Sequence, residues 1–125
     1  MATLERIAPF IEGSETVWGD SQTGYASWAG LFVAEANAQM EFPKCTAKKL
    51  SVRVLSNTLD GSTTITLRKN EEDTGIAFTI TTGQTGLFSD TGDVLIEDGD
   101  LLTAEIDIGG TSGGIAFQGG NLVYV

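Results

Sequence analysis

The residues with the clearest capacity for chemistry are carboxylates gathered in three short acidic segments, at 71–73, 90–93 and 98–100. Calcium takes about six to eight converging oxygen ligands, and the chain has no D-x-D-x-D-G loop with a trailing glutamate. The segment 98–100, Asp-Gly-Asp, is better explained by turn chemistry, because Asp binds nearby backbone groups and Gly adopts positive φ. We therefore expect no metal site and no cofactor.

The candidates for catalysis are equally sparse. The chain contains no histidine, so neither a Ser-His-Asp nor a Cys-His arrangement can form. Lys44 and Lys48 lie close enough in sequence to lower the pKa of the only cysteine, Cys45, but a buried, unreactive cysteine is the simpler interpretation. The glycine-rich segment 109–114 lacks the G-K-[ST] ending of a phosphate loop. We expect that the protein is not an enzyme.

Aromatic residues cluster near the N-terminus, at Trp18, Tyr25, Trp28 and Phe32. Trp and Tyr are enriched at interfaces because they bury a large area and keep a polar group. These residues are therefore candidates for an interface, for the core, or, at Trp18 or Trp28, for a carbohydrate platform. As the interface between protomers or with a partner we select Trp18, Tyr25, Trp28 and Tyr124.

The charge is strongly acidic and unevenly distributed. Lys and Arg number 7, Asp and Glu number 17, and the net charge is −10, which argues against nucleic-acid and anionic-membrane partners. Residues 1–43 hold one basic and six acidic side chains, and residues 44–69 hold six basic and one acidic. Residues 70–125 hold ten acidic side chains and no basic one. We expect a dipolar surface.

The basic block coincides with two predicted strands, at 48–55 and 63–69. A hairpin through Asp60-Gly61 would place these strands side by side, and their basic side chains would form one face. That face either pairs internally with acidic neighbours or docks against an acidic protein surface. Its residues are Lys48, Arg53, Lys69 and Arg68.

The elements that must position these residues are short strands. Chain length predicts one domain, and Gly, Asp, Asn and Ser punctuate β-branched runs at short intervals. No apolar run approaches about 18 residues, so no spanning helix is expected, and the start has no pattern of a secretory signal. Turns or loops are expected at 56–62, 70–75, 82–86, 89–93, 98–100 and 109–114. Strands are expected at 29–40, 48–55, 63–69, 76–80, 87–88, 94–97, 101–108, 115–117 and 122–125.

This pattern predicts an all-β fold, an antiparallel two-sheet sandwich with jelly-roll topology. Residues 25–125 would form the sandwich, and residues 1–24 an extended N-terminal arm or a first strand. The arm would lie on a neighbour, whereas the first strand would pack on the chain's own sheet. The expected core is Leu50, Val52, Val54, Ile65, Leu67, Phe78, Ile80, Leu102, Ile106 and Val123.

From about Asn57 onward the chain resembles TNF/C1q-like jelly rolls of bacteriophage capsid decoration (cement) proteins and of phage fibre or spike modules. The resemblance is carried by residues 56–58, 61–70, 83–86, 88–90 and 98–101, which is about half of the chain. It implies a homotrimer around a threefold axis. The chain departs from these families in its shortness and in lacking the collagen-like repeat of animal C1q-type heads.

The shortness favours decoration over a spike. The expected function is that of a structural virion protein, a trimer on the exterior of an icosahedral capsid that braces adjacent copies of the major capsid protein. The alternative is a carbohydrate- or receptor-binding module of a tail fibre or spike. Residues 1–12 would lie on a neighbouring subunit, for example by strand addition. The predicted capsid contacts are Leu4, Arg6, Ile7, Phe10 and Ile11.

Overall fold

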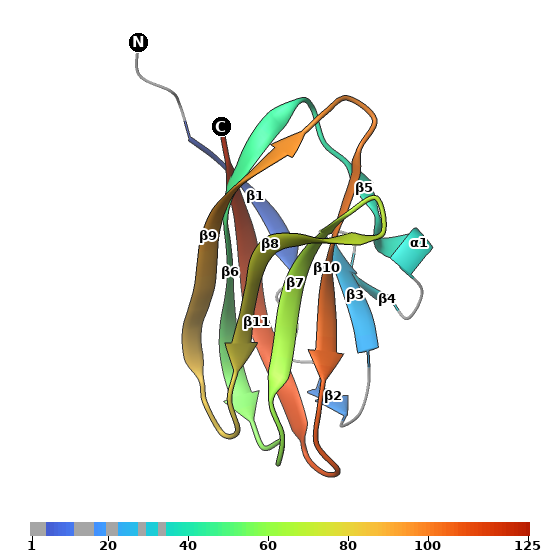
Figure 1. Cartoon of the computed structure of the whole chain (residues 1–125). Coiled ribbons are helices and arrows are strands. Elements are labelled where there is room, and N and C mark those ends of the chain that lie inside the picture. Colours follow the sequence, from blue (N-terminus) through green and yellow to red (C-terminus); the bar gives the residue numbers. More distant parts are fainter. Residues whose placement is uncertain (1–4, 12–16, 20–22, 28–29, 33–34) are drawn as a thin grey trace.

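The computed structural model is a sandwich of two antiparallel β-sheets (Figure 1), and it describes residues 5–11, 17–19, 23–27, 30–32 and 35–125. The predicted all-β, two-sheet antiparallel class is thus confirmed. No helix among the described residues is long and apolar enough to cross a membrane.

The first sheet, which we call sheet A, has the strand order β1-β11-β6-β9. Its strands are β1 (Arg6–Ile11), β11 (Gly114–Tyr124), β6 (Cys45–Asn57) and β9 (Gly86–Ile96), and β2 (Val17–Gly19) also pairs with β11. The register places Leu50 of β6 opposite Leu122 of β11, and both side chains point into the core.

The second sheet, sheet B, has the strand order β4-β3-β10-β7-β8. Its strands are β4 (Gly30–Phe32), β3 (Thr23–Ser27), β10 (Leu101–Ile108), β7 (Thr63–Lys69) and β8 (Glu72–Ile80), with β5 (Met40–Glu41) beside β10. One helical turn, α1 (Glu35–Ala38), lies between β4 and β5 in the chain.

The core lies between the two sheets and follows from the alternation of side chains along each strand. Of the ten residues expected there, eight are buried. Phe78 is partly buried and packs against the core, whereas Val123 faces outward because its neighbour Leu122 occupies the inward position. The expectation was wrong for Val123. The largest fully buried side chains are Phe117, Leu50, Leu59, Ile65, Leu67, Ile76, Ile80, Ile96, Leu102 and Ile106.

The predicted hairpin through Asp60-Gly61 is wrong, because β6 belongs to sheet A and β7 to sheet B. The segment between them crosses from one sheet to the other and buries Leu59 on the way. Its backbone instead binds the β10–β11 loop: Asp60 N donates to Ser112 O at 3.2 Å, and Gly109 N donates to Ser62 O at 2.9 Å. The two basic strands are therefore not sheet neighbours.

Several predicted boundaries are also corrected. The expected loops at 70–75 and 89–93 belong largely to β8 and to β9, and Gly119-Gly120 lies within β11 instead of splitting it. Asn70 and Glu71 alone make the turn between β7 and β8, with φ of 52° and 66°. The expected strand at 29–40 contains α1, where Ala36 and Ala38 favour a helix and the Glu35 side chain binds Arg68.

Residues 6–11 form the first strand of the chain's own sheet. β1 pairs antiparallel with β11, with Arg6 opposite Tyr124 and Ile7 opposite Val123. On that side the main-chain groups that strand addition to a neighbour would use are thus already engaged. Pro9 lies in the same edge strand, and proline reduces the ability of an edge to take up a further strand.

Candidate functional site

The structure divides the predicted basic face between the two sheets. Lys48 and Arg53 lie on β6 of sheet A, whereas Arg68 and Lys69 lie on β7 of sheet B. Lys48 pairs with Asp93, and Lys69 Nζ donates to Leu95 O at 3.1 Å. Arg53 is exposed, and no ion pair joins it to another of the described residues.

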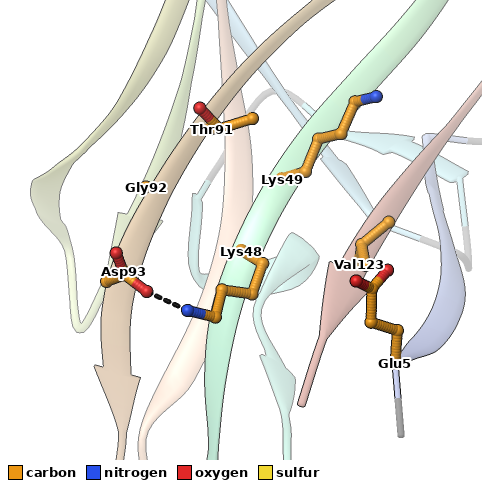
Figure 2. A pocket seen from close by; sticks show the side chains of 7 residues that line it. All are labelled: Glu5, Lys48, Lys49, Thr91, Gly92, Asp93 and Val123. Atoms are coloured by element: carbon orange, nitrogen blue, oxygen red, sulfur yellow. Dashed lines mark hydrogen bonds and ion pairs between the residues drawn. The ribbon is translucent and has the colours of Figure 1, made fainter. Parts of the chain in front are cut away.

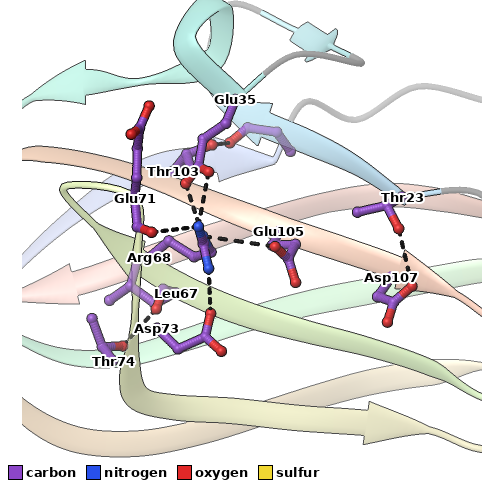
Figure 3. Close-up of polar contacts among 11 residues, drawn as sticks. Thr23, Glu35, Leu67, Arg68, Glu71, Asp73, Thr74, Thr103, Glu105 and Asp107 are labelled. Atoms are coloured by element: carbon purple, nitrogen blue, oxygen red, sulfur yellow. Dashed lines mark hydrogen bonds and ion pairs between the residues drawn. The ribbon is translucent and has the colours of Figure 1, made fainter.

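Arg68 is the centre of a cluster on the outer face of sheet B (Figure 3). Its Nε donates to Glu35 Oε1 at 2.8 Å and its Nη1 to Asp73 Oδ1 at 2.7 Å, while Glu105 Oε2 lies 3.7 Å from Nε. The Arg68 side chain is only 17% exposed. Hydrogen bonding to Glu35 is the main reason that the pKa of Arg68 is raised. This cation is therefore occupied by the fold and is not available to a partner.

The other titratable groups of this cluster respond to burial. Burial raises the pKa of Glu105, although the charge of Arg68 opposes the shift. Burial also raises the pKa of Tyr25, and the negative charge of Glu105 adds to that effect. Tyr25 is half-buried here on β3, so it contributes to the sandwich itself.

The remaining aromatic candidates are only partly placed. Tyr124 packs edge-to-face on Phe42, with ring centroids 5.6 Å apart and an interplanar angle of 82°, and it packs against the core. The backbone of Trp18 pairs with Ile115 in sheet A. The Trp18 side chain, and the whole of Trp28, lie outside the described residues.

Of the predicted capsid contacts, two have described side chains. Arg6 is exposed, and Ile7 is 68% exposed on the outer side of β1. Phe10 and Ile11 belong to β1, but their side chains, and the whole of Leu4, lie outside the described residues.

A surface that was not predicted is the outer face of sheet A. Lys49, Ser51 and Arg53 point outward along β6, between the buried Leu50, Val52 and Val54. Register places further outward residues beside them on neighbouring strands. We call this surface the sheet A face; it comprises Ile7, Lys48, Lys49, Ser51, Arg53, Leu55, Leu87, Ser89, Thr91, Asp93, Leu95, Asn121 and Val123.

All the large hydrophobic side chains that are exposed among the described residues lie on the sheet A face. Their exposed fractions are 68% for Ile7, 66% for Leu87, 54% for Leu95 and 46% for Leu55. The sequence does hold a signal for three of them. Val54-Leu55, Leu87-Phe88 and Val94-Leu95 are adjacent apolar pairs in strands, and alternation forces one member of each pair outward.

A shallow depression of about 520 Å³ lies in the sheet A face (Figure 2). Lys48, Lys49, Thr91 and Asp93 contribute its polar groups, and the ion pair between Lys48 and Asp93 crosses one side of it. Val123 and Glu5 complete the lining on the β11 and β1 side. The depression is open and its lining is both polar and apolar, so it suits a side chain of a docked surface better than an enclosed small molecule.

Several of the groups considered for catalysis or metal binding are buried or hydrogen-bonded within the fold. Cys45 is buried, and burial raises the pKa of its thiol, as expected for an unreactive cysteine. Asp100 Oδ2 accepts from Glu97 N at 2.8 Å and Oδ1 accepts from Asn70 Nδ2 at 2.8 Å, which is the turn chemistry expected at 98–100. Within the described part of the chain, no group of three or more His, Cys, Asp or Glu side chains is arranged to hold a metal ion.

Comparison with known proteins gives no match to a family model, to a curated protein or to a solved structure.

Proposed function

We propose that this chain is a non-enzymatic structural protein that acts by binding other proteins. More specifically, we propose a homotrimeric decoration protein on the exterior of a bacteriophage capsid, where it braces adjacent copies of the major capsid protein. The observation that carries the proposal of protein–protein assembly is that Ile7, Leu55, Leu87 and Leu95, the exposed large hydrophobic residues of the described chain, all lie on the sheet A face. Exposed apolar side chains that share one face indicate a protein contact.

Strand pairing supports a jelly roll as the finer topology. A jelly roll results when one long antiparallel hairpin folds over into two sheets, so that strands pair from the outermost inward. Four observed pairs follow this order: β1 with β11, β3 with β10, β6 with β9, and β7 with β8. This topology is the one that the resemblance to decoration proteins implies.

The polar chemistry of the chain supports a structural role over catalysis. Arg68 is held by Glu35 and Asp73, and Asp60 accepts hydrogen bonds from Thr111 and Ser112. A catalytic acid or base needs access to a substrate proton, whereas these groups already have partners within the fold.

Co-sedimentation tests the proposal. The purified chain is mixed with empty shells of the major capsid protein from the genome that encodes it, and the bound fraction is measured as a function of concentration. Saturable binding to these shells, and none to shells of an unrelated phage, is expected. Absence of binding, or a genome without a capsid protein, contradicts the decoration role.

The alternative is a carbohydrate- or receptor-binding module of a tail fibre or spike, for which the polar lining of the depression in the sheet A face is the favouring observation. A glycan array distinguishes the two. A reproducible hit that Trp18→Ala or Trp28→Ala abolishes favours the glycan module, whereas an array without hits, together with shell binding, favours decoration.

A further inference from the structure

We propose that the sheet A face is where one copy of this chain contacts a second copy, and that it meets a different, acidic surface of that copy. The inference rests on the homotrimer proposed above and deepens it by naming the two surfaces in contact. It is carried by the apolar content, the size and the charge of the sheet A face.

The two outer faces of the sandwich differ sharply in apolar content. On the sheet A face, the single strand β9 already exposes two large hydrophobic side chains, Leu87 and Leu95. No large hydrophobic side chain is exposed on the described part of sheet B. There the outward residues include Thr64, Thr79 and Asp107, and hydrogen bonds join Thr64 to Thr79 and Thr23 to Asp107. The described outer surface of sheet B is thus polar and hydrogen-bonded, whereas the outer surface of sheet A exposes apolar side chains.

The sheet A face has about the area that a stable contact needs. β9 has 11 residues and sheet A has four main strands, which at about 3.3 Å per residue and about 4.8 Å between strands cover roughly 700 Å². Each partner in an interface of standard size contributes about 800 Å². Many of its outward side chains, such as Ser51, Ser89 and Thr91, are short, so a second surface can approach closely.

Charge identifies the kind of surface that fits. Lys49 and Arg53 form no ion pair with any described residue, and Asp93 already pairs with Lys48. With Glu5, which lines the depression in this face, the described charges there are three basic (Lys48, Lys49 and Arg53) and two acidic (Glu5 and Asp93). The sheet A face therefore carries an excess of one positive charge in a chain whose net charge is −10. The chain itself carries the complementary acidic surface, which favours a second copy as the occupant.

The same charges disfavour a symmetric face-to-face dimer. A two-fold contact places the same patch on both sides, so Lys49 and Arg53 would oppose the cations of the same patch. A heterologous contact avoids this repulsion and closes into a ring when the rotation between copies allows it. Such a ring is the arrangement that a trimer requires.

The acidic counterpart is at the end of the sandwich where the β7–β8 and β9–β10 turns meet. Asn70 N donates to Leu101 O at 2.8 Å, which ties the two turns together. We call this surface the acidic end; it consists of the exposed Glu71, Glu72 and Asp98, which form no ion pair with another described residue. Glu71 keeps a charged side chain at φ 66°, where glycine would be favoured.

The test measures the mass of the full-length chain by size exclusion with light scattering across a concentration series. The wild type is expected at the mass of three 13.2-kDa chains and is expected to dissociate more readily at high ionic strength. Leu87→Asp should raise the dissociation constant by about tenfold or more, and Arg53→Glu should weaken assembly too. The matched control is Thr79→Asp, an exposed position on the outer face of sheet B, which should leave the mass unchanged.

A charge exchange tests the pairing of the two surfaces. Arg53→Glu with Lys49→Glu reverses the sheet A face, and Glu71→Lys with Glu72→Lys reverses the acidic end. Each reversal alone should dissociate the protein, and the chain carrying all four changes should reassemble. Circular dichroism and urea unfolding verify that every variant is folded. We expect all of them to fold, because the substituted side chains are on the surface.

The inference is overturned if the wild type is monomeric, if Leu87→Asp keeps the wild-type mass, or if the fourfold variant does not reassemble. Shell binding separates this failure from failure of the proposed function. A trimer that survives Leu87→Asp contradicts the inference alone. A chain that binds shells as a monomer contradicts both the inference and the homotrimer, but it leaves the decoration role standing. A trimer that requires the sheet A face but binds no shells contradicts the decoration role alone.

Discussion

The carboxylate of Glu35 binds the guanidinium of Arg68 through both of its oxygens, at 2.8 Å from Nε and 3.0 Å from Nη2 (Figure 3). This paired geometry is the strongest form of ion pair available to two side chains. It fastens α1 to sheet B, and it neutralises a carboxylate that is itself largely buried.

We therefore expect Arg68→Ala to destabilise the protein by about 3 kcal/mol, because removing one partner leaves Glu35 and Glu105 buried without a counter-charge. Urea unfolding followed by tryptophan fluorescence measures the loss. Arg6→Ala is the control, since the same side chain is removed from an exposed position without a described ion pair and outside the sheet A face, and it should cost less than about 0.5 kcal/mol. Equal losses in the two variants would show that the Arg68 cluster contributes nothing specific.

A second prediction concerns Asp60, which joins the β6–β7 crossing to the β10–β11 loop. Its Oδ1 accepts from Thr111 N at 2.6 Å and from Ser112 N at 3.1 Å, and its Oδ2 accepts from the Thr111 hydroxyl at 2.7 Å. These hydrogen bonds, led by the one from the Thr111 side chain, lower the pKa of Asp60 from 3.8 to about 2.

The direction of the pH dependence follows from that shift. Because the folded pKa of Asp60 is below the unfolded value, the unfolded chain binds the proton more readily, and the stabilisation is lost as pH falls from about 4 to about 2. Asp60→Asn should remove this part of the acid sensitivity, so its urea midpoint should converge with that of the wild type at pH 2. Glu41→Gln, an exposed change outside both proposed contact surfaces, should keep the wild-type profile. A constant gap between Asp60→Asn and the wild type from pH 6 to pH 2 would contradict the assignment.

The sequence predicts strands best where both the alternation and the flanking turns are clear. The strands expected at 63–69 and 101–108 coincide with β7 and β10, because Ile65 and Leu67, and Leu102 to Ile108, alternate without interruption between turn residues. In β9 the apolar alternation is interrupted because two inward positions in the middle of the strand, Asp90 and Gly92, are polar or glycine. Asp90 accepts from Ala77 N at 3.0 Å, and Gly92 leaves room for Ile76. These contacts join the two sheets, so no pattern in the sequence of β9 itself predicts them.

The division of the predicted basic face between the two sheets could not be foreseen, for a related reason. Asp60-Gly61 predicts a turn, but it does not indicate whether the next strand pairs with β6 or crosses to the other sheet. In the structure Leu59 is buried between the sheets, which favours the crossing. The sheet A face was missed because each outward leucine lies next to an inward apolar residue, and a single strand does not show which of the two faces solvent. Only the register across β6 and β9 places Leu87 beside Arg53 on one surface.

A third prediction is that Glu71→Gly stabilises the folded chain. Glu71 has a φ of 66°, in the left-handed region that costs a non-glycine residue about 1 kcal/mol. Its hydrogen bond to Arg68 uses the backbone carbonyl of Glu71, which glycine retains. Because Glu71 also belongs to the acidic end, the comparison is made in the Leu87→Asp background, in which the chain is expected to be monomeric, and thermal and urea unfolding should there show a gain of about 0.5–1 kcal/mol. Glu72→Gly, one residue further on in β8, should instead lose stability, and a loss in both variants would contradict the strain at Glu71.

The fourth prediction is that Gly61→Ala destabilises the protein through a backbone clash. A methyl group at Gly61 would lie 2.6 Å from Gly110 Cα and 2.9 Å from the Gly109 carbonyl carbon. Neither neighbour can rotate away, because both are main chain, and Gly109 N is hydrogen-bonded to Ser62 O. We expect a loss of about 1–3 kcal/mol, the usual range for inserting a methyl group into a packed site. Gly75→Ala is the matched control, since a methyl group there meets nothing within 4 Å, and unfolding should show no loss. A Gly61→Ala variant as stable as the wild type would contradict this prediction. It would mean that the β6–β7 crossing and the β10–β11 loop can move apart to accommodate the methyl group, so that the crossing does not require glycine.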